Sequence, residues 1–119
     1  MWDIVDDDGL RVMRCPSPAG GRFDPQRVDA LFEALQAHIA AEPQQGWLVD
    51  LQGFVLVNSR ALALLVATAR QVHEEGGDMV LIGVHHFVAT VLKTTRIDRL
   101  VPIYELYCEA KAALLDRAQ

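Results

Sequence analysis

Hydrophobic residues along the chain follow two rhythms, an alternating one typical of strands and a helical one with apolar positions three to four residues apart. Residues 2–15 alternate imperfectly on either side of Asp7-Asp8-Gly9, and Asp-Gly between two apolar runs predicts a β-hairpin. A helix is expected next, with Asp24 as its cap, Pro25 in the first helical position and Phe23 packed against Val28. Glu42-Pro43 is expected to end this helix, whose apolar stripe comprises Val28, Leu31, Phe32, Leu35 and Ile39.

Two apolar runs in the middle of the chain predict buried strands. Trp47–Leu51 is the first, and Met79–Val84 is nearly continuous, as is typical of a strand covered on both faces. Between them the period becomes helical from Asn58 onward, and Gly76-Gly77 is expected to end that helix. The residues expected to share its apolar face are Leu62, Leu65, Val66, Ala69 and Val72.

The last third of the chain predicts a short helix, a short strand and a final helix. The short helix is expected to turn Phe87, Val88, Val91 and Leu92 inward, and Pro102 restricts the strand at 101–104 to a sheet edge. Tyr107, Ala110, Ala113 and Leu114 make the final helix amphipathic. The order β-β-α-β-α-β-α-β-α predicts an α/β fold: one domain over residues 1–119, with a small mixed sheet, an antiparallel hairpin at its edge and about four helices.

Composition narrows the range of functions. A chain of 119 residues supports one hydrophobic core, and its net charge of −5 argues against binding nucleic acid. The sequence shows no signal-peptide pattern and no apolar run long enough to enter a membrane, so a cytoplasmic protein is expected. Cys15 and Cys108 lack metal-ligand spacing and are expected to fill the core of a reduced protein.

Ser59 stands where an apolar, strand-like run changes to a helical pattern, and three roles are open to it. Asn58 and Ser59 are both common helix caps, which makes capping the simplest interpretation. A phosphate on Ser59 would also be accommodated, because a helix start favours negative charge. A hydrolase nucleophile is disfavoured, since the frame Val57–Ala61 lacks both glycines of the G-x-S-x-G elbow.

Other reactive side chains form no recognisable catalytic or metal-binding set. His38 and His73 stand alone and His85-His86 are adjacent, without the H-x-x-x-H spacing of a metal site. His85 and His86 remain candidates for the rim of a site near Ser59, because sites on open α/β sheets lie at the carboxyl ends of strands. Asp50 is expected to accept backbone N–H groups at a strand end. No metal, cofactor or nucleotide site is predicted, and binding another protein is the remaining function.

Three segments carry a further resemblance. In VDLQGFVLVNSRALALL, a strand ending in Asp50-Leu51 is followed by an apolar run and then by Ser59 at a helix start. EEGGDMVLIGV supplies a Gly-Gly turn and a strand, and VLKTTRIDRLVPIYE follows downstream. In order and spacing these segments resemble the motifs of STAS domains, the family of bacterial anti-sigma factor antagonists. The resemblance covers residues 45–115 well and the first 45 residues more loosely.

The resemblance implies a small sheet with alternating helices and a function in partner switching. Family members bind an anti-sigma factor kinase and release it when that kinase phosphorylates the first serine of the central motif. Ser59 matches that phosphoacceptor. The implied partner-binding surface comprises Asn58, Arg60, Ala61, Leu62 and Ala63, together with Arg22 and Phe23 of the loop at 16–23.

The motif departs from the family pattern next to that serine. Asn58, Arg60 and Ala61 stand where the family has Asp, Ser and Gly, and Thr95-Arg96 replaces a later Thr-Gly. Ala61 adds bulk where a bare backbone would allow close approach. Arg60 places a cation in a first helical turn, where the helix dipole disfavours it, so it either contacts an acidic partner or reaches solvent.

Two functions therefore remain open, neither of them enzymatic nor dependent on a cofactor. The first is an anti-sigma factor antagonist that binds a serine kinase and is controlled by phosphorylation at Ser59. The second is a STAS adaptor without the switch, a subunit of a lipid or ion transporter complex or a scaffold in a stress-signalling assembly. Self-association as a homodimer is compatible with either.

Overall fold

The computed structural model describes residues 2–15, 25–54 and 57–117. In chain order the elements are β1 (Asp3–Asp7), β2 (Leu10–Arg14), α1 (Pro25–Ala41), β3 (Gly46–Asp50), α2 (Ser59–Glu74), β4 (Asp78–Ile82), α3 (His86–Thr94), α4 (Ile97–Leu100), β5 (Ile103–Tyr104) and α5 (Tyr107–Arg117). The predicted α/β order is confirmed, with α4 as an additional single turn. The expected cap and staple at Asp24 and Phe23 lie outside the described residues.

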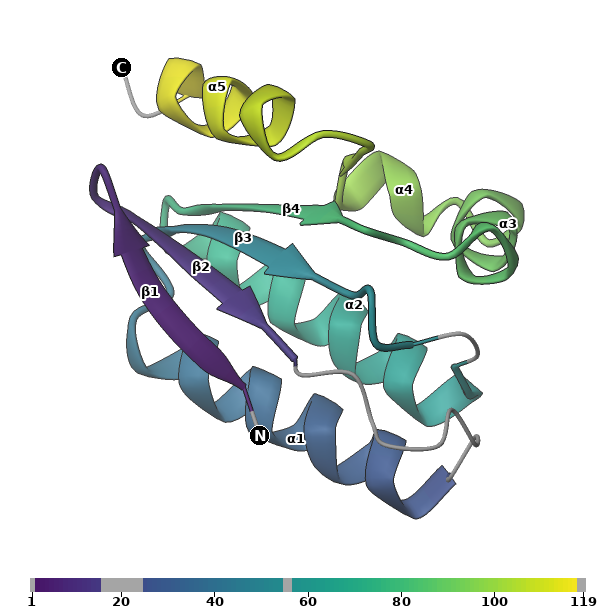
Figure 1. Ribbon diagram of the computed structural model, residues 1–119. Helices are drawn as coiled ribbons and strands as arrows, with labels where there is room; N and C mark the ends of the chain where they lie inside the picture. Colours follow the sequence, from purple (N-terminus) through teal and green to yellow (C-terminus); the bar gives the residue numbers. More distant parts are fainter. Residues whose placement is uncertain (1, 16–24, 55–56, 118–119) are drawn as a thin grey trace.

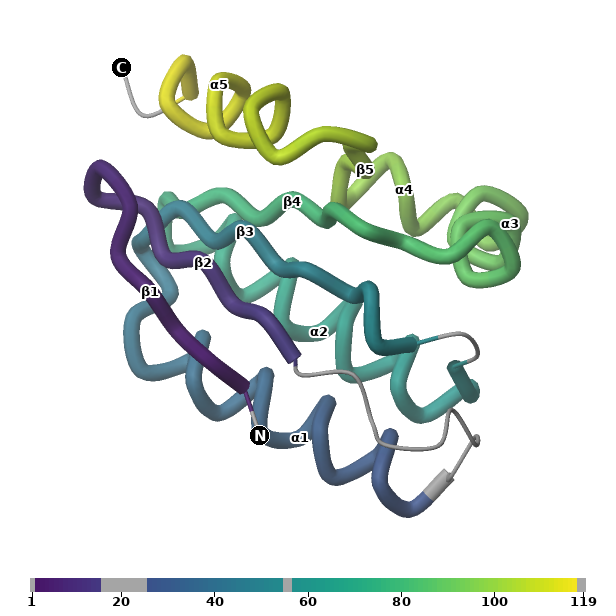
Figure 2. Tube along the Cα trace, viewed as in Figure 1, coloured from purple at the N-terminus to yellow at the C-terminus, as the bar shows by residue number. Residues whose placement is uncertain are grey.

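The strands form one mixed sheet in the order β1-β2-β3-β4-β5. β1 and β2 are the antiparallel hairpin that Asp-Gly predicts, and the remaining neighbours pair in parallel. Figure 1 shows α1 and α2 together on one face of this sheet and α5 on the other. In Figure 2 the chain leaves β4 for α3, beyond the carboxyl end of the strand, and returns through α4 to β5.

Each face of the sheet carries its own hydrophobic core, and β3 and β4 contribute to both. Trp47 and Val49 belong to the larger core under α1 and α2, whereas Leu48 between them belongs to the smaller core under α5. Met79 and Leu81 alternate with Val80 and Ile82 in the same way. Because successive side chains of a strand point to opposite faces, burial of every residue is the expected signature of a central strand.

The hairpin closes one side of the sheet. Trp2 is buried, and its indole N–H donates a hydrogen bond to the carbonyl oxygen of Leu31 on α1 at 2.6 Å. β1 itself is an edge strand, and its apolar side chains are exposed, 37% at Ile4 and 58% at Val5. Trp2, the residue before β1, therefore anchors the start of this uncovered strand on α1.

A group of polar side chains, here called the C-terminal clamp, joins α5 to the hairpin: Asp7, Asp8, Tyr107 and Lys111. The Tyr107 hydroxyl donates to Asp7, and Lys111 Nζ lies 3.0 Å from Asp7 Oδ1 and 2.9 Å from Asp8 Oδ2. The Tyr107 hydrogen bond, followed by that of Lys111, lowers the pKa of Asp7. Burial, and then the bond to Asp7, raises the pKa of Tyr107.

Three side chains expected in the core are exposed. Phe87 is 54% and Val91 37% exposed, because α3 lies beyond the end of β4 and buries only the stripe of Val88 and Leu92. Cys108 is also exposed, since α5 turns Ala110 and Leu114 towards the sheet instead. Cys15 is buried as expected.

Candidate functional site at the start of α2

The loop after β3 begins with a turn that Asp50 holds in place. Asp50 Oδ1 accepts the backbone N–H of Gln52 at 2.9 Å, the structural role expected from the sequence. The backbone N–H of Phe54 then donates to the carbonyl oxygen of Leu51 at 2.9 Å, which turns the Phe54 ring towards the core. This ring packs against Phe32 of α1, with centroids 5.1 Å apart, so the segment leading to α2 is anchored on α1.

Asn58, rather than Ser59, caps α2. Its backbone is extended, and its Oδ1 accepts the N–H of Ala61 at 2.8 Å. The amide of the same side chain donates to Asp29 Oδ1 on α1 at 2.9 Å. A carboxylate at position 58 would meet Asp29 with like charge, so Asp29 gives a physical reason for asparagine where the family motif has aspartate.

Ser59 occupies the first helical position, and its side chain is exposed. Among the residues that the structure describes, none forms a hydrogen bond with its hydroxyl. The cap is already made by Asn58, so the capping role considered for Ser59 is not needed here. The position offers a free hydroxyl on the surface beside the positive end of a helix dipole.

Arg60 and Ala61 are both engaged within the chain. The Arg60 guanidinium reaches solvent, one of the two outcomes expected for it, and it also forms an exposed ion pair with Glu33 of α1. Ala61 is fully buried in the larger core, and its side chain is unavailable to a partner, contrary to expectation. The residues Asp29, Glu33, Asn58 and Arg60 are called the α2 clamp below, because they bind the start of α2 to α1.

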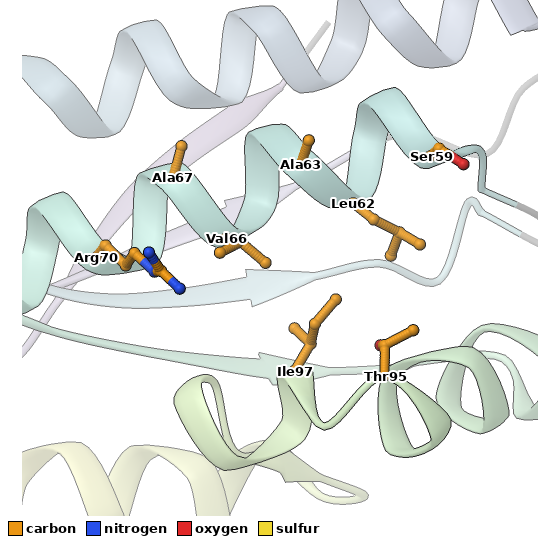
Figure 3. A pocket seen from close by; sticks show the side chains of 8 residues that line it. All are labelled: Ser59, Leu62, Ala63, Val66, Ala67, Arg70, Thr95 and Ile97. Atoms are coloured by element: carbon orange, nitrogen blue, oxygen red, sulfur yellow. The ribbon is translucent and has the colours of Figure 1, made fainter.

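A groove of about 480 Å³ runs along α2 from Ser59, between this helix and the segment that joins α3 to α4. In Figure 3, Leu62 and Val66 point across it towards Thr95 and Ile97. It is lined by Ser59, Leu62, Ala63, Val66, Ala67, Arg70, Thr95 and Ile97. Leu62 and Ala63, expected at a partner surface, thus lie beside Ser59, whereas Arg22 and Phe23 fall outside the described residues.

The far half of this groove carries little signal in the amino-acid sequence. Ser59, Ala63 and Ala67 are four residues apart, so helical spacing alone would have placed Ala67 on the same side of α2. Thr95 and Ile97 had no such signal, because only the tertiary fold brings α4 against α2. Leu62 and Val66 were expected on the core face of this helix. Both are half-buried and line the groove, and Leu62 also packs against the larger core.

His85 and His86 lie at the start of α3 and take a structural role there. His85 Nδ1 accepts the backbone N–H of Phe87 at 3.3 Å, which caps the helix, and its ring stacks on that of His86 with centroids 4.5 Å apart. Neither histidine lines the groove. In the part of the chain that the structure describes, no three His, Cys, Asp or Glu side chains group closely enough to hold a metal ion.

Comparison with known proteins places this arrangement in a family. The family model of the Mlab STAS domain matches residues 19–102, well over half of the chain. The chain belongs to the STAS domain family. The expected STAS fold is thereby confirmed, and the groove lies along α2 within the matched residues.

Solved STAS structures agree with this fold over nearly the full chain. An anti-sigma-factor antagonist (STAS) domain protein from Planctomyces limnophilus is 26% identical, with 99% of this chain and 98% of that chain covered and a TM-score of 0.78. An anti-sigma factor antagonist from Mycobacterium paratuberculosis is 23% identical, covers 98% and 94%, and has a TM-score of 0.75. A serine-to-glutamate variant of RsbS from Moorella thermoacetica is 20% identical, covers 98% and 97%, and has a TM-score of 0.73.

These matches establish an anti-sigma factor antagonist-like STAS fold. None of the helices within residues 2–15, 25–54 and 57–117 has the length and apolar character needed to span a bilayer.

Proposed function

We propose that this STAS protein is a partner-switching antagonist, which binds an anti-sigma factor with serine kinase activity and releases it when Ser59 is phosphorylated. The observation that supports the proposal best is the state of Ser59. Its hydroxyl is exposed at the end of an apolar groove, while its neighbours Asn58 and Arg60 are held by α1. Of these three motif positions, Ser59 is the one whose side chain is left for a second molecule.

Phosphorylation at this position would disturb an interface far more than the fold. In the reaction the γ-phosphoryl group of ATP moves to Ser59 Oγ, ADP leaves, and a base on the kinase takes the hydroxyl proton. The product lies at a helix start, where the first N–H groups and the dipole favour an anion. A charge of about −1.5 to −2 at the rim of an apolar groove would nevertheless weaken the complex, because a docked partner would have to remove water from the phosphate.

The test uses the purified chain, a candidate anti-sigma factor kinase and ATP with Mg²⁺. Mass spectrometry should find one added phosphate, and fragmentation should locate it on Ser59. Ser59→Ala should abolish the addition, whereas Ser17→Ala, the matched change at the other serine of the chain, should not. Absence of phosphate with a kinase shown to be active on another substrate would overturn the proposal.

Binding to the same kinase is then measured by isothermal titration. Ser59→Asp should weaken the complex by at least tenfold, while Ser59→Ala and Ser17→Asp should retain it. Circular dichroism of Ser59→Asp should match the wild type, because an acidic residue in the first turn suits the helix. Equal affinity of Ser59→Asp and wild type would contradict the switch.

A constitutive adaptor is the second candidate, and one observation favours it. Asn58 and Arg60, two of the positions that depart from the family motif, contact α1 and so serve this chain's own fold. An adaptor would hold its partner regardless of Ser59. Unchanged affinity of Ser59→Asp, together with absence of phosphate, would support it against the switch, and Arg60→Glu would show whether the α2 clamp supports that interface.

A further inference from the structure

We propose that the groove beside α2 receives an amphipathic helix of the partner protein, with acidic residues on the sides that face Arg70 and the segment 93–99. The inference deepens the proposed function, since it takes the α2 face as the contact surface, but it does not require phosphorylation. Its support is the distribution of basic side chains, the backbone conformation of Arg96 and the shape of the groove.

Basic side chains are distributed unevenly between paired and unpaired positions. Arg11, Arg60, Lys111 and Arg117 form ion pairs with carboxylates, and Arg14 lies over the ring of Tyr107. Four basic side chains make no ion pair, hydrogen bond or cation–π contact with any residue that the structure describes: Arg70, Lys93, Arg96 and Arg99. All four are exposed. They lie on α2 and in the segment 93–99, the two elements that border the groove.

This cationic group is notable in a chain of net charge −5. Arg70, Thr95 and Ile97 line the groove, and Arg96 lies between the last two in sequence. Asp98 is the acidic residue of the segment 93–99. A partner helix that places carboxylates beside Arg70 and the segment 93–99 would be attracted, whereas a nucleic acid would be repelled by the acidic remainder of the molecule.

The conformation of Arg96 indicates that its side chain is kept for a purpose other than folding. Its φ of 63° and ψ of 17° are left-handed, a region that favours glycine because a Cβ crowds the backbone there. The residue stands between the end of α3 and the start of α4, where glycine is the common choice. Arginine at a strained, exposed position fits a role in contacting another molecule.

The groove itself fits a helix. Ser59 and Arg70 are eleven residues apart on α2, so the groove extends over about 16 Å, or about three helical turns. Ala63 and Ala67 are small, which permits a second helix to lie close to α2. Leu62, Val66 and Ile97 offer apolar contacts along its length.

The experiment selects binders from a displayed library of amphipathic helical peptides with a fixed apolar stripe and randomised polar positions. The recovered peptides should be enriched in Asp and Glu at the positions that flank the apolar stripe, and NMR titration should shift resonances of Ser59–Arg70 and residues 93–99. Failure to recover a binder, or recovery without acidic enrichment, would overturn the proposal. Peptides that shift the resonances of residues on other surfaces would overturn it as well.

Two variants test the cationic group directly. Arg70→Gln with Arg96→Gly should weaken a selected peptide about tenfold, since each contact at an interface rim contributes modestly. Arg96→Gly alone should weaken binding while raising Tm by a few degrees, because glycine relieves the left-handed strain. Ala112→Glu, at an exposed position of α5, lowers the net charge by one unit, as Arg96→Gly does, and should leave binding unchanged.

Other occupants give different results. Peptide affinity that is insensitive to Arg70 and Arg96 would contradict the proposal, as would preferential binding of RNA or of vesicles with anionic lipids. Concentration-dependent dimerisation lost in the same variants would assign the groove to a second copy of the chain instead. If the kinase does not phosphorylate Ser59 but acidic peptides still bind the groove, only the proposed switch is overturned. If Ser59 is phosphorylated but acidic peptides do not bind, only this inference is overturned.

Discussion

The C-terminal clamp and the α2 clamp join helices to neighbouring elements with similar chemistry but leave different surfaces behind. In the C-terminal clamp, Tyr107 and Lys111 of α5 are both directed to carboxylates of the hairpin. In the α2 clamp, Asn58 and Arg60 are directed to α1, and Ser59 between them is not. Both α5 side chains of the C-terminal clamp have partners within the chain, whereas the α2 clamp leaves the Ser59 hydroxyl exposed and without a partner among the described residues.

This difference separates residues that hold the fold from a residue that is available to a partner. Because the polar groups on either side of Ser59 already have partners, a change at position 59 need not disturb the helix start. A change at Asn58 or at Tyr107 removes a contact on which an element depends. We therefore expect large stability effects at the less exposed clamp residues, such as Asn58, and small ones at Ser59 and at the exposed Arg60.

The largest effect is expected from Asn58→Asp, which restores the family's residue. The new carboxylate would still cap α2 but would lie against Asp29 instead of donating to it. We expect a loss of about 2 kcal/mol at neutral pH, since a hydrogen bond is lost and like charges meet. Urea unfolding measures it, with Asn58→Ser as the control that retains a cap without charge. Equal stability of the two variants would contradict the role of Asp29.

An intermediate effect is expected from Asp7→Asn, as a change in pH dependence. The lowered pKa of Asp7 means that the folded state favours its carboxylate. This stabilisation is complete above the unfolded-state pKa of about 4 and is lost as the pH falls through the lower pKa of the folded state. Asp7→Asn should lower Tm by a few degrees at neutral pH and flatten the acid limb of the Tm profile.

Asp3→Asn, on the same strand, is the control for this profile. Asp3 is exposed, so its substitution should leave the acid limb in place. Parallel profiles of the wild type and Asp7→Asn would show that the C-terminal clamp does not depend on this carboxylate.

The smallest effect is expected from Arg60→Ala. The Arg60–Glu33 pair is exposed on both sides, 58% at Arg60 and 52% at Glu33, and exposed ion pairs are weakened by solvent. Tm should stay within the error of the measurement, and the double variant Arg60→Ala with Glu33→Ala should behave in the same way. A clear drop in Tm for either variant would contradict this expectation. It would show that the exposed Arg60–Glu33 pair stabilises the fold about as much as the Asn58–Asp29 hydrogen bond.

The order of elements was predictable because each apolar run is long enough to show its period. β4 is buried on both faces and reads as a continuous apolar run, and α1 begins and ends at the residues that Pro25 and Glu42-Pro43 indicate. The single turn of α4 was missed, since four residues are too few to display a helical rhythm. Exposure of Phe87 and Val91 was missed for another reason, because a stripe at helical spacing does not show what covers it.

For the site, the sequence located the helix start but not its contacts. The choice between Asn58 and Ser59 as cap depends on backbone geometry that either residue is able to adopt. The partner of Arg60 is 27 residues away in the chain, and that of Asn58 is 29 away, so only the packing of α1 on α2 reveals them. The residues of α2 that line the groove follow helical spacing in the sequence, whereas Thr95 and Ile97 join them only through the tertiary fold.

The exposed edge of β1 has a consequence for the protein in crowded solution. A free strand edge is a template on which another chain adds by backbone pairing, and the exposed Ile4 and Val5 would strengthen such growth. Three of the five residues of this strand are aspartates. Asp6 and Asp7 pair with Arg11 and Lys111, but two molecules that approach edge to edge would still bring carboxylates of like charge together, which opposes aggregation. The strand that opens the fold thus also keeps neighbouring molecules apart.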